Sequence, residues 1–554
     1  MALSIVDRMA PLAQVALITA ATWIFWRGLR RWLGSNPLDN IPGPPSQSWL
    51  AGHFEQLWDV KNGWGFHQSI SEKYGGVLRL AGPLGKKMLY VFDPKALHQI
   101  MVKELYTFEE SPGFTIGADI SLGKGLLATQ GAWHKKQRKM LNPVFSIAHM
   151  KGMVPIFYDV VDKLRDTFEK KIENGPVEID VTSWMARTAL ELIGQSGLGY
   201  SFDSLEEGTE EHPYCNAAKM YIPVTNNLMT SRFYLLPLIH KLNLPPRFLR
   251  WLVDIVPWKD LHDARDIVDV MWDTATKIVE SKKQAIREGD DSIARQVGKG
   301  KDIISILIKA NMQVDEAERL SDEEVLGQVG TLTFTATDST SSALSRILHV
   351  LCEHVDWQDK LRAEIKDAQK KHGERLDYDV LNALPLMDAV CRETLRLYPP
   401  VSTLLRETVA DVMLPFSKPI IGVDGKEISE VLVPKGTMIF PSLLGSNRHP
   451  DVWGPTAYEW RPERWIEGLP ESVLNAKVPG IYSHLMTFIG GGRACIGFKF
   501  SQLEMKVALC TLLGTFKFAA PKDKEIYWQM TSLVTPTVNG SSKPSLPLIV
   551  SRAD

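Results

Sequence analysis

The sequence predicts a mainly α fold with a small β part. Apolar residues recur at helical spacing in 498–513, and 325–350 is a second long apolar segment of the same type. Short runs typical of β-strands occur at 77–80 and 88–92, and strand signals return near 412–440. Most of the remaining chain has helical rather than alternating spacing, so we expect helices to dominate.

The composition indicates an ordinary globular protein. The chain has 554 residues, of which 44% are hydrophobic, and its formal net charge is −2. This balance gives no indication of nucleic-acid binding. The five cysteines are an odd number, widely spaced and without a Cys-x-x-Cys pair. They do not form a disulfide framework, which predicts a reducing compartment for most of the chain.

The N-terminus predicts a single membrane anchor over 9–27, after a short lumenal segment, 1–8. Residues 9–26 are almost wholly apolar, and about 18 residues give roughly 27 Å of helix, close to the bilayer core of roughly 30 Å. Aromatic and basic residues cluster at its end: Trp23, Trp26, Arg27, Arg30 and Arg31. This excess of arginines places the C-terminal side in the cytoplasm. A cleaved signal peptide and a buried core helix are the alternatives.

A basic and proline-rich linker is predicted at 28–45, and the rest, 46–554, forms one large domain. The linker ends in Pro42-Gly43-Pro44-Pro45. Its prolines fix φ and favour an extended, semi-rigid path. The segment would therefore orient the domain against the membrane, or serve as a plain connection.

The segment 488–497 presents a cysteine in a glycine-rich bend. Cys495 follows Arg493 by two residues and precedes the helix predicted at 498–513. The start of that helix would direct backbone N–H groups at the sulfur and lower its pKa, and a thiolate suits a soft or borderline metal. A buried free cysteine is the alternative. A phosphate loop is excluded, because Phe498 stands where Lys and Ser/Thr are needed.

The apolar helix predicted at 325–350 is interrupted by polar residues at 333–342. Asp338 and several hydroxyl groups in an apolar helix are costly unless they form hydrogen bonds. Such hydroxyls can bond carbonyl groups one turn back and bend the helix. The segment is therefore either a locally bent core helix or a polar notch that carries protons to a buried centre.

The pattern Phe-x-x-Gly-x-Arg-x-Cys-x-Gly at 488–497 resembles the haem-thiolate loop of the cytochrome P450 family. Two further motifs stand in the same order as in that family, Glu393-Thr394-Leu395-Arg396 and Pro462-Glu463-Arg464-Trp465. The resemblance covers essentially the whole chain. It implies the cytochrome P450 fold, a haem-thiolate catalytic domain at 46–554, and a structural network of Glu393, Arg396 and Arg464. Taken alone, Glu-x-x-Arg is equally typical of a surface ion pair that contributes little to stability.

The resemblance implies that haem b is bound through Cys495 as the ligand of its iron. The family places side chains at the haem propionates where this sequence has His134, Arg138, Arg406 and Arg493. His134 takes the place of the family's tryptophan, while Trp133 is one residue out of register. Guanidinium groups match carboxylates. The alternative for the basic stretch 132–140 is a solvated face.

The family's oxygen-activation pattern, Ala/Gly-Gly-x-Asp/Glu-Thr-Thr, aligns with the polar notch. Ala336 replaces the second-position glycine, and Ser339 replaces the threonine after the acid. The serine keeps a hydroxyl group, so the resemblance implies that Asp338 and Ser339 organise water and deliver protons.

By resemblance, the chain inserts one oxygen atom of O2 into a C–H bond of a lipophilic substrate, possible examples being terpenoids and other fungal secondary metabolites. It carries no dinucleotide fingerprint, so we expect electrons from NADPH through a separate flavoprotein reductase, with the lysines of 132–140 as a docking face. The anchor predicts the endoplasmic reticulum membrane. Two other classes stay open: an isomerase or dehydratase of this family that uses no O2, and a membrane-tethered binding protein in which Cys495 is structural.

Overall fold

The computed structural model describes residues 36–553 except 210, 211, 290, 291, 293–296, 299 and 542, together with residues 22, 23 and 26. Apart from those three residues, the predicted anchor at 9–27 lies outside the described part, as do the lumenal segment 1–8 and residues 28–35 of the linker. Within the described part, no single helix has the length and apolar character needed to cross a bilayer. One bent pair, Gly131–Phe145 with Ile147–Lys171, passes that test by length and composition.

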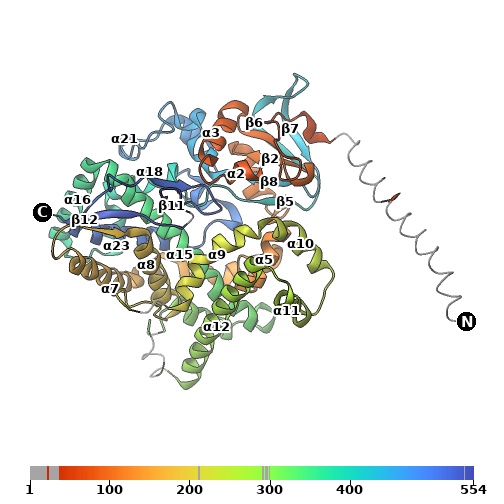
Figure 1. The fold of residues 1–554 in the computed structure, drawn as a ribbon. Helices are drawn as coiled ribbons and strands as arrows, with labels where there is room; N and C mark the ends of the chain where they lie inside the picture. The colour runs from red at the N-terminus through yellow and green to blue at the C-terminus, as the bar shows by residue number, and fades with distance from the viewer. Residues whose placement is uncertain are drawn as a thin grey trace, which may run out of the picture.

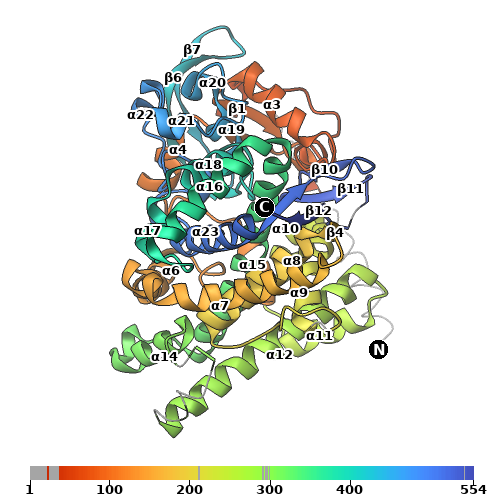
Figure 2. The ribbon, with the colours of Figure 1, turned by 90° about the vertical axis from the view of Figure 1, so that its left-hand side faces the viewer.

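The architecture is a large helical part with a β-rich part at one end, which confirms the prediction of a mainly α fold. Figures 1 and 2 both show the strands β6 and β7 at the top of the molecule and the long helix α12 at the bottom. The helices of the large part are α5 (Pro112–Leu122), α6 (Gly131–Leu141), α7 (Ile147–Lys171), α8 (Val181–Leu192), α9 (Pro213–Asn227), α10 (Met229–Lys241), α11 (Pro246–Ile255), α12 (Lys259–Glu288), α14 (Ile303–Gln313), α15 (Asp322–Glu353), α16 (Val355–His372), α17 (Tyr378–Ala383), α18 (Pro385–Leu397) and α23 (Phe498–Thr515).

The shorter helices accompany the β-rich part and the segment that leads to the cysteine. They are α2 (Phe54–Leu57), α3 (Gly63–Tyr74), α4 (Pro94–His98), α19 (Leu443–Arg448), α20 (Pro450–Trp453), α21 (Arg464–Glu467) and α22 (Glu471–Ala476). Two of them, α4 and α20, begin at a proline, which is pre-organised for the first helical position because its φ is fixed.

The largest sheet has five strands in the order β1-β2-β8-β5-β3. Its strands are β1 (Val77–Ala81), β2 (Lys87–Val91), β3 (Phe108–Glu109), β5 (Arg406–Thr408) and β8 (Met438–Pro441). β2 and β8 are parallel, and the other pairs are antiparallel. β1 and β2 confirm the strand predictions at 77–80 and 88–92. The sheet brings β5 and β3, which are almost 300 residues apart in the chain, to the same edge.

Three smaller sheets complete the β part. The antiparallel pair β6 (Val412–Ile421) and β7 (Glu427–Val433) accounts, with β8, for the strand signals predicted at 412–440. A three-stranded sheet has the order β4-β12-β9, and β10 pairs with β11. The sequence did not predict these five strands, which are β4 (Val177–Asp180), β9 (Phe516–Ala519), β10 (Ile526–Gln529), β11 (Thr535–Val538) and β12 (Pro547–Arg552). These segments are too short for a clear alternation of apolar and polar residues, and their pairing with distant strands makes them strands.

The helix α15 runs through the centre of the helical part (Figures 1 and 2). It begins with a capping box, in which the Ser321 hydroxyl accepts from the Glu324 N–H and the Glu324 carboxylate accepts from the Ser321 N–H. It packs against α5, α8, α12, α18 and α23. The predictions of helix at 325–350 and 498–513 are therefore both confirmed, and these two helices carry the notch and the cysteine.

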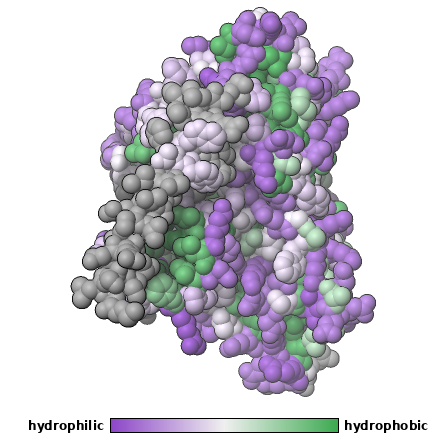
Figure 3. Space-filling model, turned by 90° about the vertical axis from the view of Figure 1, so that its right-hand side faces the viewer, coloured by the Kyte–Doolittle hydropathy of each residue, from purple (hydrophilic) through white to green (hydrophobic). Residues whose placement is uncertain are grey.

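A hydrophobic patch is exposed on α10 and α11. Phe248, Trp251 and Ile255 follow helical spacing on α11, and they are 42%, 53% and 53% exposed. Leu238 and Leu242, at the end of α10 and directly after it, are also exposed. Figure 3 looks onto this side of the molecule and shows hydrophobic residues gathered among polar ones. Exposed apolar areas of this kind mark surfaces that meet another apolar phase.

Candidate functional site

The cysteine loop lies so close to neighbouring backbone that two of its glycines leave no room for a side chain. A Cβ at Gly490 would lie 1.4 Å from the Pro479 carbonyl oxygen, and one at Gly491 would lie 1.9 Å from that of Met101. Gly491 also has φ +71°, a conformation that glycine adopts without strain. The Cys495 N–H then donates to the Phe488 carbonyl oxygen at 2.9 Å. These contacts present Cys495 immediately before α23.

Burial dominates the electrostatics of the Cys495 thiol. Burial raises its pKa, while the Gly497 N–H and the Arg138 guanidinium act in the opposite direction with smaller effect. The expectation that the helix start lowers this pKa is therefore wrong for the thiol itself, because desolvation of the sulfur outweighs the backbone dipoles. Metal coordination reverses this balance, since a coordinating thiol loses its proton.

Four cationic or hydrogen-bonding side chains from three segments gather beside this loop. His134 and Arg138 come from α6, Arg406 from β5, and Arg493 from the loop itself. Burial, together with the positive charges of Arg493, Arg138 and Arg406, lowers the pKa of His134 to about 3. The imidazole is therefore neutral at physiological pH. The structure brings together all four residues that the sequence assigned to the propionates.

Two of these arginines are paired with glutamates that the sequence analysis missed. Arg493 Nη2 lies 2.9 Å from Glu109 Oε2, and Arg406 Nη1 lies 2.7 Å from Glu110 Oε2. Glu109 belongs to β3, which pairs with β5, so the sheet edge sets this arrangement. No sequence motif marks Glu109 or Glu110, because only the strand pairing places them here.

Hydrogen-bonding capacity remains after these pairs are formed. The buried Arg406 Nε has no hydrogen-bond partner in the described part of the chain. Arg138 donates to the Ala494 carbonyl oxygen at 2.5 Å and to Asn142 Oδ1 at 3.1 Å, and neither partner is charged. The cluster thus has donors and positive charge available for an added dianion.

The polar notch of α15 holds a half-buried acid among hydroxyls that form hydrogen bonds. Burial raises the pKa of Asp338 to about 7. The Ser339 hydroxyl donates to the Thr335 carbonyl oxygen at 2.8 Å, and the Thr337 hydroxyl donates to that of Thr333 at 2.7 Å. Each hydroxyl therefore bonds one turn back, while Asp338 is able to exchange a proton near neutral pH.

Thr335 was overlooked in the sequence. It is exposed although it lies in the middle of the central helix, one turn before Ser339. The sequence could have shown this residue, because Thr335 stands at the first position of the oxygen-activation pattern, where the family has Ala or Gly. It adds a third departure from that pattern to those at Ala336 and Ser339.

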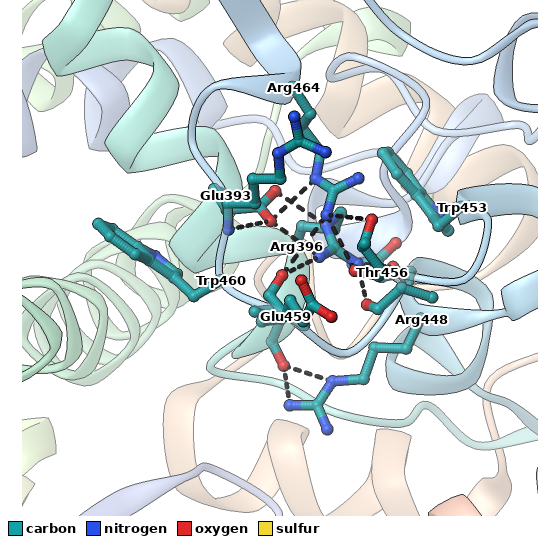
Figure 4. A network of polar contacts seen from close by, with 12 residues as sticks. Glu393, Arg396, Arg448, Trp453, Thr456, Glu459, Trp460 and Arg464 are labelled. Atoms are coloured by element: carbon teal, nitrogen blue, oxygen red, sulfur yellow. Dashed lines mark hydrogen bonds and ion pairs between the residues drawn. The ribbon is translucent and has the colours of Figure 1, made fainter.

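A buried network locks α18 onto the segment that leads to the cysteine loop (Figure 4). Arg396 forms two hydrogen bonds of 2.9 Å with the Glu393 carboxylate, and Arg464 Nε adds a third of 3.0 Å. Glu393 and Arg396 are fully buried. Burial acts to raise the pKa of Glu393, but the two arginines hold it below its ordinary value. Arg396 also donates to the carbonyl oxygens of Asn447 and Ala457. The structure therefore contains the network that the resemblance implied.

The comparisons with known proteins agree with this site. A family model described as "Cytochrome P450" matches residues 42–544. Cytochrome P450 monooxygenase 91 of Postia placenta is 49% identical over 98% of this chain and 99% of its own length. Cytochrome P450 monooxygenase 212 of the same fungus is 47% identical over 96% and 97%. A ganoderic acid synthetase of Ganoderma lucidum is 40% identical over the same shares of the two chains.

The chain belongs to the cytochrome P450 family. The relatives named monooxygenases make it an enzyme of the oxidoreductase class. The family implies haem iron as cofactor, and the residues present fit that group. Cys495 offers the soft ligand, and the arginine cluster offers unpaired donors for two propionates.

We expect Glu393→Gln to destabilise the fold strongly. The substitution leaves two buried guanidinium groups without their charge partner, and breaking a buried pair in this way costs roughly 3–5 kcal/mol. Denaturant titration of the full chain measures the effect. Asp367→Asn, which breaks the exposed pair with Lys371, is the matched control and should cost less than about 0.5 kcal/mol. Equal effects of the two substitutions would contradict a locking role.

The Asp338 pKa predicts a pH dependence of stability. The folded state holds this proton up to about pH 7, whereas the unfolded chain releases it near pH 4. The contribution of Asp338 to stability is therefore present below pH 4 and is lost as pH rises towards 7. Between pH 5 and pH 8 the wild type should lose about 2 kcal/mol relative to Asp338→Asn. Denaturation midpoints at both pH values test this, and parallel profiles would show that the acid is not buried.

Proposed function

We propose that this enzyme inserts one oxygen atom of O2 into a C–H bond of a lipophilic substrate, with electrons from NADPH through a separate flavoprotein reductase. The observation that carries the proposal is a half-buried cysteine held by backbone contacts beside three arginines and a neutral histidine. That arrangement fits a metal ligand and two anionic side groups of one cofactor. Haem bound there supplies the redox centre for reduction and activation of O2.

The residues of this chain then have separate tasks. Cys495 supplies the ligand sulfur, and the Gly490 and Gly491 contacts fix its position. Arg138 and Arg406 provide donors to the propionates. His134, neutral at physiological pH, donates one N–H without adding charge.

Proton delivery is assigned to the notch in α15. Asp338, with a pKa of about 7, takes up and releases a proton at its carboxylate near neutral pH, where a proton carrier is most effective. The Ser339 hydroxyl is held by the Thr335 carbonyl oxygen, which orients its oxygen to accept from water. Thr335 offers a further hydroxyl on the same face.

A lipophilic substrate is supported by the surroundings of α15. The Phe334 ring lies 5.0 Å from the Tyr221 ring of α9, in an edge-to-face arrangement. An aromatic side chain of α9 thus packs against the helix that carries the notch, one turn before the notch acid. The relative named for ganoderic acid synthesis supports a terpenoid substrate within this class.

A membrane location follows from two features, and we propose the endoplasmic reticulum with the catalytic domain in the cytoplasm. The predicted anchor at 9–27 is the first. The exposed patch on α10 and α11 is the second, because its side chains would be stabilised in the apolar layer of a bilayer. Both would bring a lipophilic substrate to the enzyme.

Docking of the reductase is proposed on the face of α6. Lys135 is exposed there. Lys136 already donates to the Arg319 carbonyl oxygen, and Lys139 pairs with Glu318 at 3.2 Å. Lys135 is therefore the lysine of this stretch most available to an acidic partner.

Cys495→Ala should abolish both the haem-thiolate spectrum and turnover. The substitution removes the only sulfur in the cysteine loop, so carbon monoxide added to the reduced protein should not give the thiolate-type Soret band. Turnover is measured with an NADPH-dependent reductase and a panel of terpenoids. Cys352→Ala, outside the loop, is the control and should retain both properties. Retained turnover in Cys495→Ala would defeat the proposal, and product formed without reductase or NADPH would favour an isomerase.

Ser339→Ala should uncouple NADPH consumption from product formation. Without the hydroxyl, the notch would deliver protons less directly, and we expect the product formed per NADPH to fall several-fold while hydrogen peroxide rises. Product, peroxide and NADPH are measured in one assay. Thr337→Val, whose hydroxyl is buried and bonded within the helix, is the matched control. Unchanged coupling in Ser339→Ala would remove Ser339 from the proton route.

A further inference from the structure

A second pair of buried arginines lies away from the cysteine loop. Arg346 belongs to α15, and Arg448 ends α19. The Arg448 guanidinium lies 4.8 Å from the Trp64 ring and 5.3 Å from the Tyr398 ring. Arg346 lies 5.8 Å and 4.1 Å from the same two rings. The two cations therefore share one aromatic cluster, although more than 100 residues separate them in sequence.

Arg346 is a buried cation that forms no ion pair within the described part of the chain. The side chain is 9% exposed, and its Nε is enclosed without a hydrogen-bond acceptor in the described part of the chain. It is held instead by aromatic faces, with the Trp528 ring 3.7 Å away. The nearest acid that influences it is Glu353, which is exposed.

Arg448 is bound only to a neutral group. Its guanidinium donates through Nε, at 2.7 Å, and through Nη2 to the Leu397 carbonyl oxygen. Figure 4 shows this guanidinium below the Glu393 network and pointing away from it. The charged or titratable groups that influence it are Tyr398, Arg396, Tyr458 and Tyr90, none of which is a carboxylate.

Two neighbouring guanidinium groups without a counter-ion are costly in a buried place. Burial, with a smaller contribution from the charge of Arg448, lowers the pKa of Arg346 to about 9, and burial, with the charge of Arg396, lowers that of Arg448 to about 10. A buried charge is ordinarily paired, because desolvation is otherwise uncompensated. The aromatic faces compensate in part, and an anion at this place would complete the compensation.

A cavity opens onto Arg448. Its volume is about 730 Å³, within the range of small-molecule sites. Trp64 and Arg448 line it together with apolar side chains of the β-rich part, including Val77, Phe92, Ile420 and Leu444. No residue of the cysteine loop, the α6 cluster or the α15 notch lines it. The cavity is thus separate from the catalytic site.

The acids that line this cavity already have partners of their own. Asp93 accepts from the Ser417 N–H and hydroxyl. Asp451 pairs with Lys418 at 2.9 Å, and Glu72 accepts from Gln68 at 2.9 Å. The partners of Asp93 and Glu72 are neutral, so these two carboxylates keep their charge, and Arg448 is the lining cation that no carboxylate of the described residues pairs with.

We propose that this cavity binds an anionic amphiphile, a small molecule with one carboxylate or phosphate group on Arg448 and an apolar body along the cavity. A guanidinium group recognises both oxyanions by paired hydrogen bonds. Arg346 strengthens the binding through its charge from behind the Trp64 and Tyr398 rings. Because Arg448 also bonds the end of α18, the ligand would stabilise the helix that carries Glu393.

Equilibrium dialysis of the haem-loaded full chain tests the proposal with dodecanoate, dodecyl phosphate, dodecanol and inorganic phosphate. We expect both amphiphilic anions to bind. Dodecanol lacks the anionic group and inorganic phosphate lacks the apolar body, so each should bind at least about tenfold more weakly. Arg448→Gln should weaken dodecanoate about tenfold and Arg346→Gln several-fold, because each removes a positive charge. Lys371→Gln, which removes an exposed cation that pairs with Asp367 and does not line the cavity, is the control and should leave the affinity unchanged.

The Soret spectrum separates this site from the catalytic one. Dodecanoate bound in the proposed cavity leaves the spectrum unchanged, and this spectroscopic result does not depend on turnover. Unchanged affinity in both arginine variants would overturn the proposal. If Arg448→Gln does not fold, the affinity of Arg346→Gln alone decides the test. Binding that always shifts the Soret band would place the anion in the catalytic pocket instead. If dodecanol bound as tightly as dodecanoate, the negative charge would not contribute to binding, which would also overturn the proposal.

Discussion

The buried carboxylate of Glu393, held by two guanidinium groups, is the interaction on which the site depends. Arg396 extends it to the Asn447 carbonyl oxygen. The Asn447 side chain then accepts from the Met486 N–H and donates to the Thr487 hydroxyl. These residues directly precede Phe488, whose carbonyl oxygen receives the Cys495 N–H. An unbroken set of hydrogen bonds therefore connects α18 to the cysteine. A buried charge network is suited to fixing the position of the cysteine, because displacement of either Glu393 or its arginines would leave a buried charge unpaired.

Desolvation governs the three titratable groups of the site in a common way. It raises the pKa values of Cys495 and Asp338 and lowers that of His134. Each neutral form is favoured because a charge is costly in a low-dielectric interior. The arginines keep their charge under the same burial, since their ordinary pKa is far above neutral. The site is thus a set of neutral acids and bases beside permanent cations, an environment that favours an incoming dianion.

Sequence reasoning predicted the elements with strong periodicity and the residues in specific motifs. Helices α15 and α23 and strands β1 and β2 appear where their patterns placed them. The Glu393 network was anticipated from motif order alone. Glu109 and Glu110 were not, because a two-residue strand carries no pattern and only its pairing with β5 brings them to the arginines. The thiol pKa was predicted in the wrong direction, since a helix start is visible in sequence and the depth of burial is not.

The sequence by itself determined the protein family, the position of the cysteine and the polar interruption of the central helix, because local spacing and residue type encode these features. The tertiary structure alone decided which distant charges meet. It joined β3 to β5, placed Arg346 and Arg448 around the same aromatic rings, and enclosed Asp338 deeply enough to bring its pKa near neutrality. The physical reason is that pair interactions and desolvation depend on distance and burial in space.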